Sequence, residues 1–192
     1  MNTQGKGGRG LVLAVSAATA IVLTGCGHSG KGSSPNAVEA KATAGGDIPD
    51  NQVFLVFANR AAGYSMKYPE GWAQRGTGKR VTFRDKNNFV RLVVGPGAAL
   101  TKASARTDIA HVPGARPQGG PKAMTLPGGP AFKVVYKAAS AANAVTGTRV
   151  KLVVDRYYLW KGGRRAVVDL GTPVGVDNVD AYRRMIESFR WR

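Results

Sequence analysis

The chain has 192 residues, 43% of them hydrophobic, and its Lys and Arg residues outnumber Asp and Glu by 28 to 11. This length suits one ordinary domain with additional segments, and the basic excess favours contact with nucleic acid, anionic lipid or phosphate-rich polymers. A single Cys and two His exclude an internal disulfide framework, a cysteine-cluster zinc site and a His-rich metal site.

The N-terminus has the pattern of an export signal. Lys6 and Arg9 precede the uncharged residues 11–23, which are too few for an ordinary membrane-spanning helix of about 20 residues. Leu23-Thr24-Gly25-Cys26 resembles the bacterial lipobox. The resemblance implies diacylglycerol attached to Cys26 and cleavage between Gly25 and Cys26. The alternatives are a plain secretory peptide with an incidental Cys, or an uncleaved anchor.

The lipobox predicts where the protein acts. We expect a signal peptide over residues 1–25 and a mature chain lipid-anchored at the extracytoplasmic face of the cell membrane. Nucleic acid is then not an expected partner, although the mature chain keeps 26 of the 28 basic residues. The Gly-, Ala- and Arg-rich composition is compatible with an actinobacterial source.

A tether is predicted between the lipid and the domain. Residues 26–50 contain no aromatic residue and little apolar bulk, so they cannot offset the entropy cost of ordering. Random-coil scaling gives the 24 residues after Cys26 a typical reach of roughly 25–30 Å. The domain is expected over residues 51–192.

Hairpins dominate the predicted domain. Residues 65–69 alternate as a half-buried strand does, within the apolar and aromatic segment 53–72. Residues 79–95 form two alternating runs around the turn-favouring residues 85–88. A second hairpin is expected over 122–137, and a third joins 148–160 to 164–173 through a Gly-Gly turn.

Two helices complete the prediction. Residues 101–112 favour a helix that Pro113 and Gly114 end. Near the C-terminus, apolar residues recur every three or four positions, as on one face of a helix. They are Val179, Tyr182, Met185, Ile186 and Phe189. Asp177 or Asn178 suits the N-cap. The pattern predicts one α+β domain, an antiparallel β-sheet flanked by helices.

The order of these elements resembles PsbP-like domains. The resemblance rests on the segments YSMKYPEGW, VTFRDKNNFVRLVV, LPGGPAFKVVY and AYRRMIESFRW. This family includes the extrinsic photosystem II protein, the Ran-binding Mog proteins and envelope lipoproteins of the LpqN type. The resemblance implies an α/β/α sandwich around an antiparallel sheet. It also implies a binding or assembly-assisting role, with no catalytic residues to carry over.

Familiar catalytic motifs are missing from the sequence. Ser65 lacks the second Gly of a nucleophile elbow, and the Gly-Lys pair at 78–79 lacks the rest of a phosphate loop. His111 has no visible partner and is expected at a helix end. Asp155 and Asp169 lie inside apparent strands, where they form a paired acid site, make ion pairs with nearby arginines or simply face solvent.

A basic sheet face is the remaining candidate site. Strand alternation places Arg80 and Arg84 on one face, with Arg91 from the partner strand and Lys151 from elsewhere. Tyr157, Tyr158 and Trp160 are expected beside them. This face would suit an anionic or sugar-bearing ligand, or it is a charged row that protects a sheet edge.

The predicted function is therefore a binding one. We expect a membrane-anchored extracytoplasmic lipoprotein whose non-catalytic accessory domain binds a protein partner or an anionic envelope polymer or lipid. The alternative is an envelope lipid- or glycan-processing enzyme that uses the strand carboxylates. No cofactor and no metal site are expected.

Overall fold

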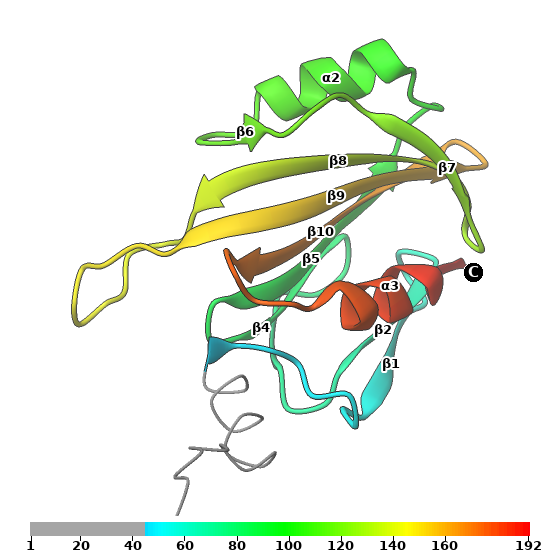
Figure 1. Cartoon of the computed structure of the whole chain (residues 1–192). Helices are drawn as coiled ribbons and strands as arrows, with labels where there is room; N and C mark the ends of the chain where they lie inside the picture. Colours follow the sequence, from blue (N-terminus) through cyan, green and yellow to red (C-terminus); the bar gives the residue numbers. More distant parts are fainter. Residues whose placement is uncertain (1–44) are drawn as a thin grey trace, which may run out of the picture. The chain divides into compact units, whose positions relative to one another are not determined.

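A computed structural model describes residues 45–192 of the chain (Figure 1). Most of its strands belong to one antiparallel sheet with the order β3-β4-β5-β10-β9-β8-β6, while β7 also pairs with β8. The strands of this large sheet are β3 (Ala73–Arg75), β4 (Arg80–Asp85), β5 (Asn88–Pro96), β6 (Arg116–Pro117), β7 (Lys122–Leu126), β8 (Gly129–Ala139), β9 (Lys151–Lys161) and β10 (Arg164–Pro173).

All three predicted hairpins are confirmed. β4 and β5 pair from Arg80↔Val93 to Asp85↔Asn88, so the turn lies at residues 86–87. The hairpin of β7 and β8 closes at Leu126↔Gly129, and that of β9 and β10 closes at Lys161↔Arg164. Pro127-Gly128 and Gly162-Gly163 form the second and third turns, whereas the first is Lys86-Asn87, with Lys86 at a φ of 50°.

Both predicted helices are confirmed, with tighter bounds. α2 (Lys102–Ala110) begins after a reciprocal cap, in which Thr101 Oγ1 accepts from Ser104 N at 3.0 Å and Ser104 Oγ accepts from Thr101 N at 2.9 Å. α3 (Val179–Glu187) buries Tyr182, Met185 and Ile186. Val179 differs from the predicted face, because it lies in the first turn and 68% of its surface is exposed.

A second, smaller sheet was not predicted. It has the order β1-β2-β11, formed by β1 (Phe54–Asn59), β2 (Tyr64–Pro69) and β11 (Arg190–Trp191). The final strand is only two residues long and pairs with Tyr64 and Ser65, far away in the sequence. Its sequence therefore gives no local alternation to recognise.

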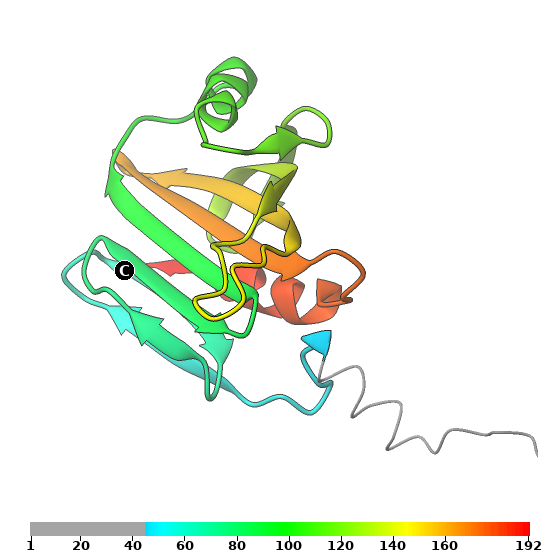
Figure 2. The ribbon, with the colours of Figure 1, turned by 90° about the vertical axis from the view of Figure 1, so that its left-hand side faces the viewer.

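The large sheet separates two hydrophobic cores. One core packs the sheet against α3 and β2 and includes Phe83, Leu92, Leu159, Met185 and Phe189. The other packs β8 and β9 against α2, through Ala105 and Ile109. Figures 1 and 2 show α2 on one side of the large sheet, and α3 with the small sheet on the other. Residues 45–192 thus have hydrophobic cores of their own on both sides of the large sheet, and a core of its own is what a domain needs to fold independently.

The domain begins earlier than the expected boundary at residue 51. Ile48 N donates to Asn178 Oδ1 at 2.7 Å, and the Asn178 side chain in turn donates to the Gly46 carbonyl at 3.3 Å. Asn88 also donates to the Gly46 carbonyl. Asn178 is buried, so these bonds fix residues 46–48 to the domain, and the expected tether does not extend to residue 50.

Candidate anion-binding groove

α2 covers only part of the face on which it packs. Over β8 and β9 this face is buried core, whereas over β4, β5 and β10 it is partly open, with Phe89 and Asp169 buried. A groove of about 710 Å³ follows the boundary between the two parts. Its walls come from the end of α2 and from residues 138–141, at the end of β8 and just after it, and its floor comes from the open strands.

Strand register places arginines on this floor. Thr82 of β4 faces Arg91 of β5, so Arg80 and Arg84, two residues to either side of Thr82, share the same face. Arg91 in turn faces Asp169 of β10, which faces Arg156 of β9. Five arginines and two aspartates line the groove, which leaves an excess of three positive charges.

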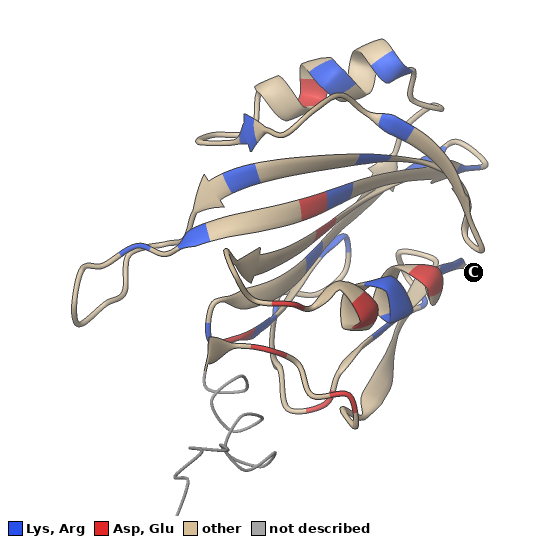
Figure 3. Cartoon of the chain, in the orientation of Figure 1, with Lys and Arg blue, Asp and Glu red and all other residues tan. Residues whose placement is uncertain are grey.

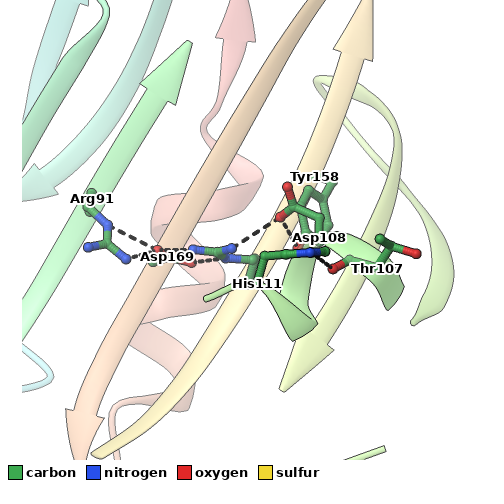
Figure 4. Close-up of polar contacts among 7 residues, drawn as sticks. Arg91, Thr107, Asp108, His111, Tyr158 and Asp169 are labelled. Atoms are coloured by element: carbon green, nitrogen blue, oxygen red, sulfur yellow. Dashed lines mark hydrogen bonds and ion pairs between the residues drawn. The ribbon is translucent and has the colours of Figure 1, made fainter. Parts of the chain in front are cut away.

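A buried carboxylate holds two of these arginines (Figure 4). Asp169 has 1% of its side chain exposed and accepts from Arg156 Nε at 2.6 Å and from Arg156 Nη2 at 3.0 Å. Arg91 Nε donates to the same carboxylate at 3.1 Å, and Arg91 Nη2 makes a second contact. Asp169 thus fixes both guanidinium groups at the floor of the groove.

The same chain of contacts continues to α2. Arg156 Nη1 lies 3.2 Å from Asp108 Oδ2, and the Tyr158 hydroxyl donates to that oxygen at 2.8 Å. Burial, with the hydrogen bond to Asp108, raises the pKa of the Tyr158 hydroxyl. Burial alone would lower the pKa of Arg156, but hydrogen bonding and attraction from Asp169 outweigh it and raise the pKa. These contacts join the sheet to α2 beside the groove.

The remaining groove arginines have no carboxylate partner within residues 45–192. They are Arg80, Arg84 and Arg165. Arg84 lies 5.4 Å from the centre of the Phe89 ring, and Arg91 lies 5.8 Å from it. Figure 3 shows that basic residues are spread over both sides of the domain. In the groove, three arginines without a carboxylate partner share one sheet face, with Arg80 and Arg84 exposed and Arg165 half-buried.

Half of the six predicted binding residues come together in the groove, namely Arg80, Arg84 and Arg91. Trp160 shares their face but packs against Phe132, with ring centres 5.5 Å apart. Lys151 and Tyr157 were wrongly grouped with them. Side chains of a strand alternate, so these two residues lie on the opposite face of the sheet.

Two groove arginines were missing from the predicted set, namely Arg156 and Arg165. Counting back from the Lys161–Arg164 turn places Asp169 opposite Arg156, so the sequence did contain a signal for that pair. Arg91 joins Asp169 through pairing between β5 and β10, which are separated by 67 residues in the chain. No local pattern reports such a contact.

The two strand carboxylates do not form a paired acid site. Asp169 faces the groove, whereas Asp155 belongs to the opposite face and lies 2.6 Å from Lys133 Nζ. Burial would lower the pKa of Lys133, but the hydrogen bond and attraction from Asp155, with a further contribution from Tyr157, raise it. Each carboxylate is engaged in an ion pair rather than with the other.

His111 ends α2, as expected, and also lines the groove. Its Nδ1 atom lies 2.7 Å from the Thr107 carbonyl oxygen. Among residues 45–192, no three His, Cys, Asp or Glu side chains gather as metal ligands would. In the same range, no helix is long and apolar enough to cross a membrane. Gly25 and Cys26 lie outside the described residues.

Comparison with known proteins shows the fold. No protein-family model matches the chain, and no curated protein matches it. The solution structure of cyanobacterial PsbP (CyanoP) from Synechocystis matches with a TM-score of 0.53 and 15% identity, over 77% of this chain and 98% of that one. The domain therefore has the PsbP-like α+β fold, a large antiparallel sheet with two helices.

Two weaker structural likenesses were also found. The Ran-binding protein Mog1p from Saccharomyces cerevisiae gives a TM-score of 0.46 at 9% identity, over 73% of this chain and 96% of that one. LpqN, which is involved in cell envelope biogenesis in Mycobacterium tuberculosis, gives 0.38 at 14% identity, over 75% and 87%. The fold assignment rests on the CyanoP match.

Proposed function

We propose that this protein is an envelope lipoprotein that binds an anionic component in the groove beside α2, without catalysing a reaction. The observation that carries the proposal is the set of three groove arginines that lack a carboxylate partner within residues 45–192. Arg80 and Arg84 are exposed and Arg165 is half-buried, and three cations that share one sheet face attract an anion more strongly than a single cation would.

The lipobox supports the proposed location. Acylation of Cys26 would attach the chain to the outer face of the cytoplasmic membrane. Metabolic labelling with palmitate tests this point. We expect label in the intact protein and none in a Cys26→Ala variant, with unprocessed precursor accumulating under globomycin. Labelling that persists in the variant would contradict acylation at Cys26.

Thermal unfolding of residues 45–192 tests the groove. At low salt we expect pyrophosphate to raise the Tm, by about 5–10 °C at a hundred times its Kd. The Arg80→Gln/Arg84→Gln double variant should lose most of this rise. Lys67→Gln is the matched control, because Lys67 is an exposed residue of β2 outside the groove. Equal Tm rises in all three proteins would exclude the groove as the site.

A second observation supports a protein partner, at the outer edge of β1. The Val53 carbonyl accepts from Glu70 N, and Lys67 N donates to Ser188 Oγ, on the side away from β1. By the alternation of antiparallel pairs, Phe54, Val56 and Ala58 direct their backbone groups outward. β1 contains no charge and no Pro, and Val56 is 58% exposed.

Among residues 45–192, β1 is an edge strand with no partner on its outer side, and such an edge suits an added strand from another protein. Proximity labelling in native envelopes tests it with a Val56→Pro variant. Because the N–H of residue 56 points outward, the substitution removes a donor for the partner without breaking the β1–β2 pair. We expect the proteins that dock on β1 to be labelled by the unmodified protein and not by the variant. Unchanged labelling would show that β1 is not a docking edge.

The enzyme alternative loses its paired carboxylates, since Asp155 and Asp169 lie on opposite faces and each makes an ion pair. A turnover screen on envelope lipids and glycans would revive it only if Asp169→Asn abolished turnover while the folded fraction stayed unchanged.

A further inference from the structure

The three unpaired groove arginines lie far apart on the floor. Arg80 and Arg84 are separated by four residues along β4, which corresponds to about 13 Å between their Cα atoms. Arg80, Val93 and Val167 are in register across β4, β5 and β10. Arg165 lies two strands away and one side-chain row further along, at about 12 Å from Arg80.

The side chains do not converge on one point. Arg84 is placed over the Phe89 ring, which pairs directly with it across the strands, so it does not lean toward Arg80. The Cβ of Arg165 lies beside Gly97, the residue directly after β5, and is 2.9 Å from the place where a Cβ on Gly97 would stand. Arg91, between them, is held by Asp169. The groove therefore offers separate positive positions rather than one anion cage.

The shape of the groove favours an extended chain over a membrane surface. Arg91 has 37% of its side chain exposed, and the α2 end and residues 138–141 rise beside the floor. Arg80 and Arg84 are exposed, but a flat bilayer would meet these walls before it reached the half-buried Arg165, whereas a linear polymer can lie along the floor. The guanidinium fork suits phosphate oxygens, and each of the groove cations is an Arg.

We infer that the ligand of this groove is a linear polyanion with repeated phosphate groups, bound at separate points by Arg80, Arg84 and Arg165. This inference rests on the proposed anion-binding function and specifies its ligand class. The polymer runs across β4, β5 and β10, and Arg91, positioned by Asp169, contributes positive charge between the three points.

The salt dependence of binding measures how many arginine–phosphate contacts form. Affinity of residues 45–192 for long-chain inorganic polyphosphate is measured at several NaCl concentrations by fluorescence anisotropy. Three contacts predict a slope of log K against log salt of about −2 to −3. Each single variant, Arg80→Gln, Arg84→Gln or Arg165→Gln, should reduce the slope by about one contact and weaken binding at low salt. Lys67→Gln should leave the slope unchanged.

Parallel probes separate the possible failures. If pyrophosphate binds with the same slope and affinity as polyphosphate, the groove is a single-anion site; the polymer inference then fails and the proposed function stands. If neither probe binds, both fail. Vesicles of phosphatidylglycerol and phosphatidylcholine in equal parts should not displace polyphosphate. Full displacement, lost in the arginine variants, would identify a membrane surface as the ligand and overturn the inference.

Discussion

Arg156 and Asp169 face each other across the β9–β10 pair, with Arg156 Nε donating to Asp169 Oδ1 at 2.6 Å. The carboxylate is almost fully buried, and it also receives Arg91 from the neighbouring strand. Asp169 thus holds two guanidinium groups, and Asp108, 3.2 Å from Arg156 Nη1, supplies the second negative charge. This arrangement keeps positive charge in a recess without leaving it unpaired.

Asp169→Asn should be strongly destabilising. It leaves Arg91 without a carboxylate and Arg156 with Asp108 alone, and breaking a buried ion pair costs about 3–5 kcal/mol. Urea unfolding of residues 45–192 measures the change. Asp155→Asn is the matched control, because its ion pair with Lys133 is partly exposed and should be worth less than about 1 kcal/mol. Equal losses for both variants would contradict a buried triad.

Gly171→Ala should disturb the groove through packing. A Cβ at Gly171 would lie 2.1 Å from Phe89 Cε1, the ring on which Arg84 and Arg91 rest. Displacing this ring should cost about 1–3 kcal/mol and weaken anion binding. Gly95→Ala on β5 is the control, since no atom lies within 4 Å of its added Cβ. A Gly171→Ala variant as stable as Gly95→Ala would show that Phe89 has room to move.

Asn178→Ala should release the start of the domain. Its buried side chain bonds Ile48 N, the Gly46 carbonyl, Asn88 and Thr172. We expect a loss of about 1–3 kcal/mol and faster amide exchange at Ile48. Asp180→Asn, which removes an exposed ion pair with Arg183, should leave exchange at Ile48 unchanged. If the Ile48 amide stayed protected from exchange in both variants, residues 46–48 would be held by contacts other than those of Asn178.

Alkaline pH should unfold the domain in part through Tyr64. Burial raises the pKa of Tyr64 to about 12, from an ordinary 10. Between these values the unfolded chain loses the phenolic proton first, so the stability present below pH 10 declines as pH rises toward 12. The Tyr64 hydroxyl has no hydrogen-bond partner within residues 45–192. Tyr64→Phe should therefore fold well, and its free energy of unfolding should fall less steeply with pH over this range. The same pH dependence in both proteins would show that Tyr64 does not contribute to alkaline unfolding.

Local patterns were sufficient to predict the three hairpins of the large sheet, but not its short strands β3 and β6. Alternation and turn residues identified the β4–β5 and β9–β10 hairpins, and apolar spacing identified α3. These features depend on residues close in the sequence, where strand parity and helical period are directly readable. Asn178 shows a limit of prediction from local patterns. It occupies the N-cap position, but its side chain makes no cap bond and instead joins the buried network with Asn88 and Thr172.

The remaining features depend on pairing between strands that are distant in the sequence, which local patterns do not predict. The partnership of β5 with β10 brings Arg91 to Asp169, and that of β2 with β11 builds the small sheet. Parity alone would have separated Tyr157 from Tyr158, since neighbouring strand residues face opposite ways. The groove itself follows from how far α2 extends over the sheet, which depends on tertiary packing rather than on any motif.

NMR of the arginine Nε–H groups in residues 45–192, during a titration with long-chain inorganic polyphosphate at low salt, tests the proposed groove most directly. We predict that the resonances of Arg80, Arg84 and Arg165 shift with one binding constant, while those of Arg184 and Arg190, outside the groove, stay in place. Shifts confined to Arg184 and Arg190, or no shifts at all, would contradict an anion site in the groove.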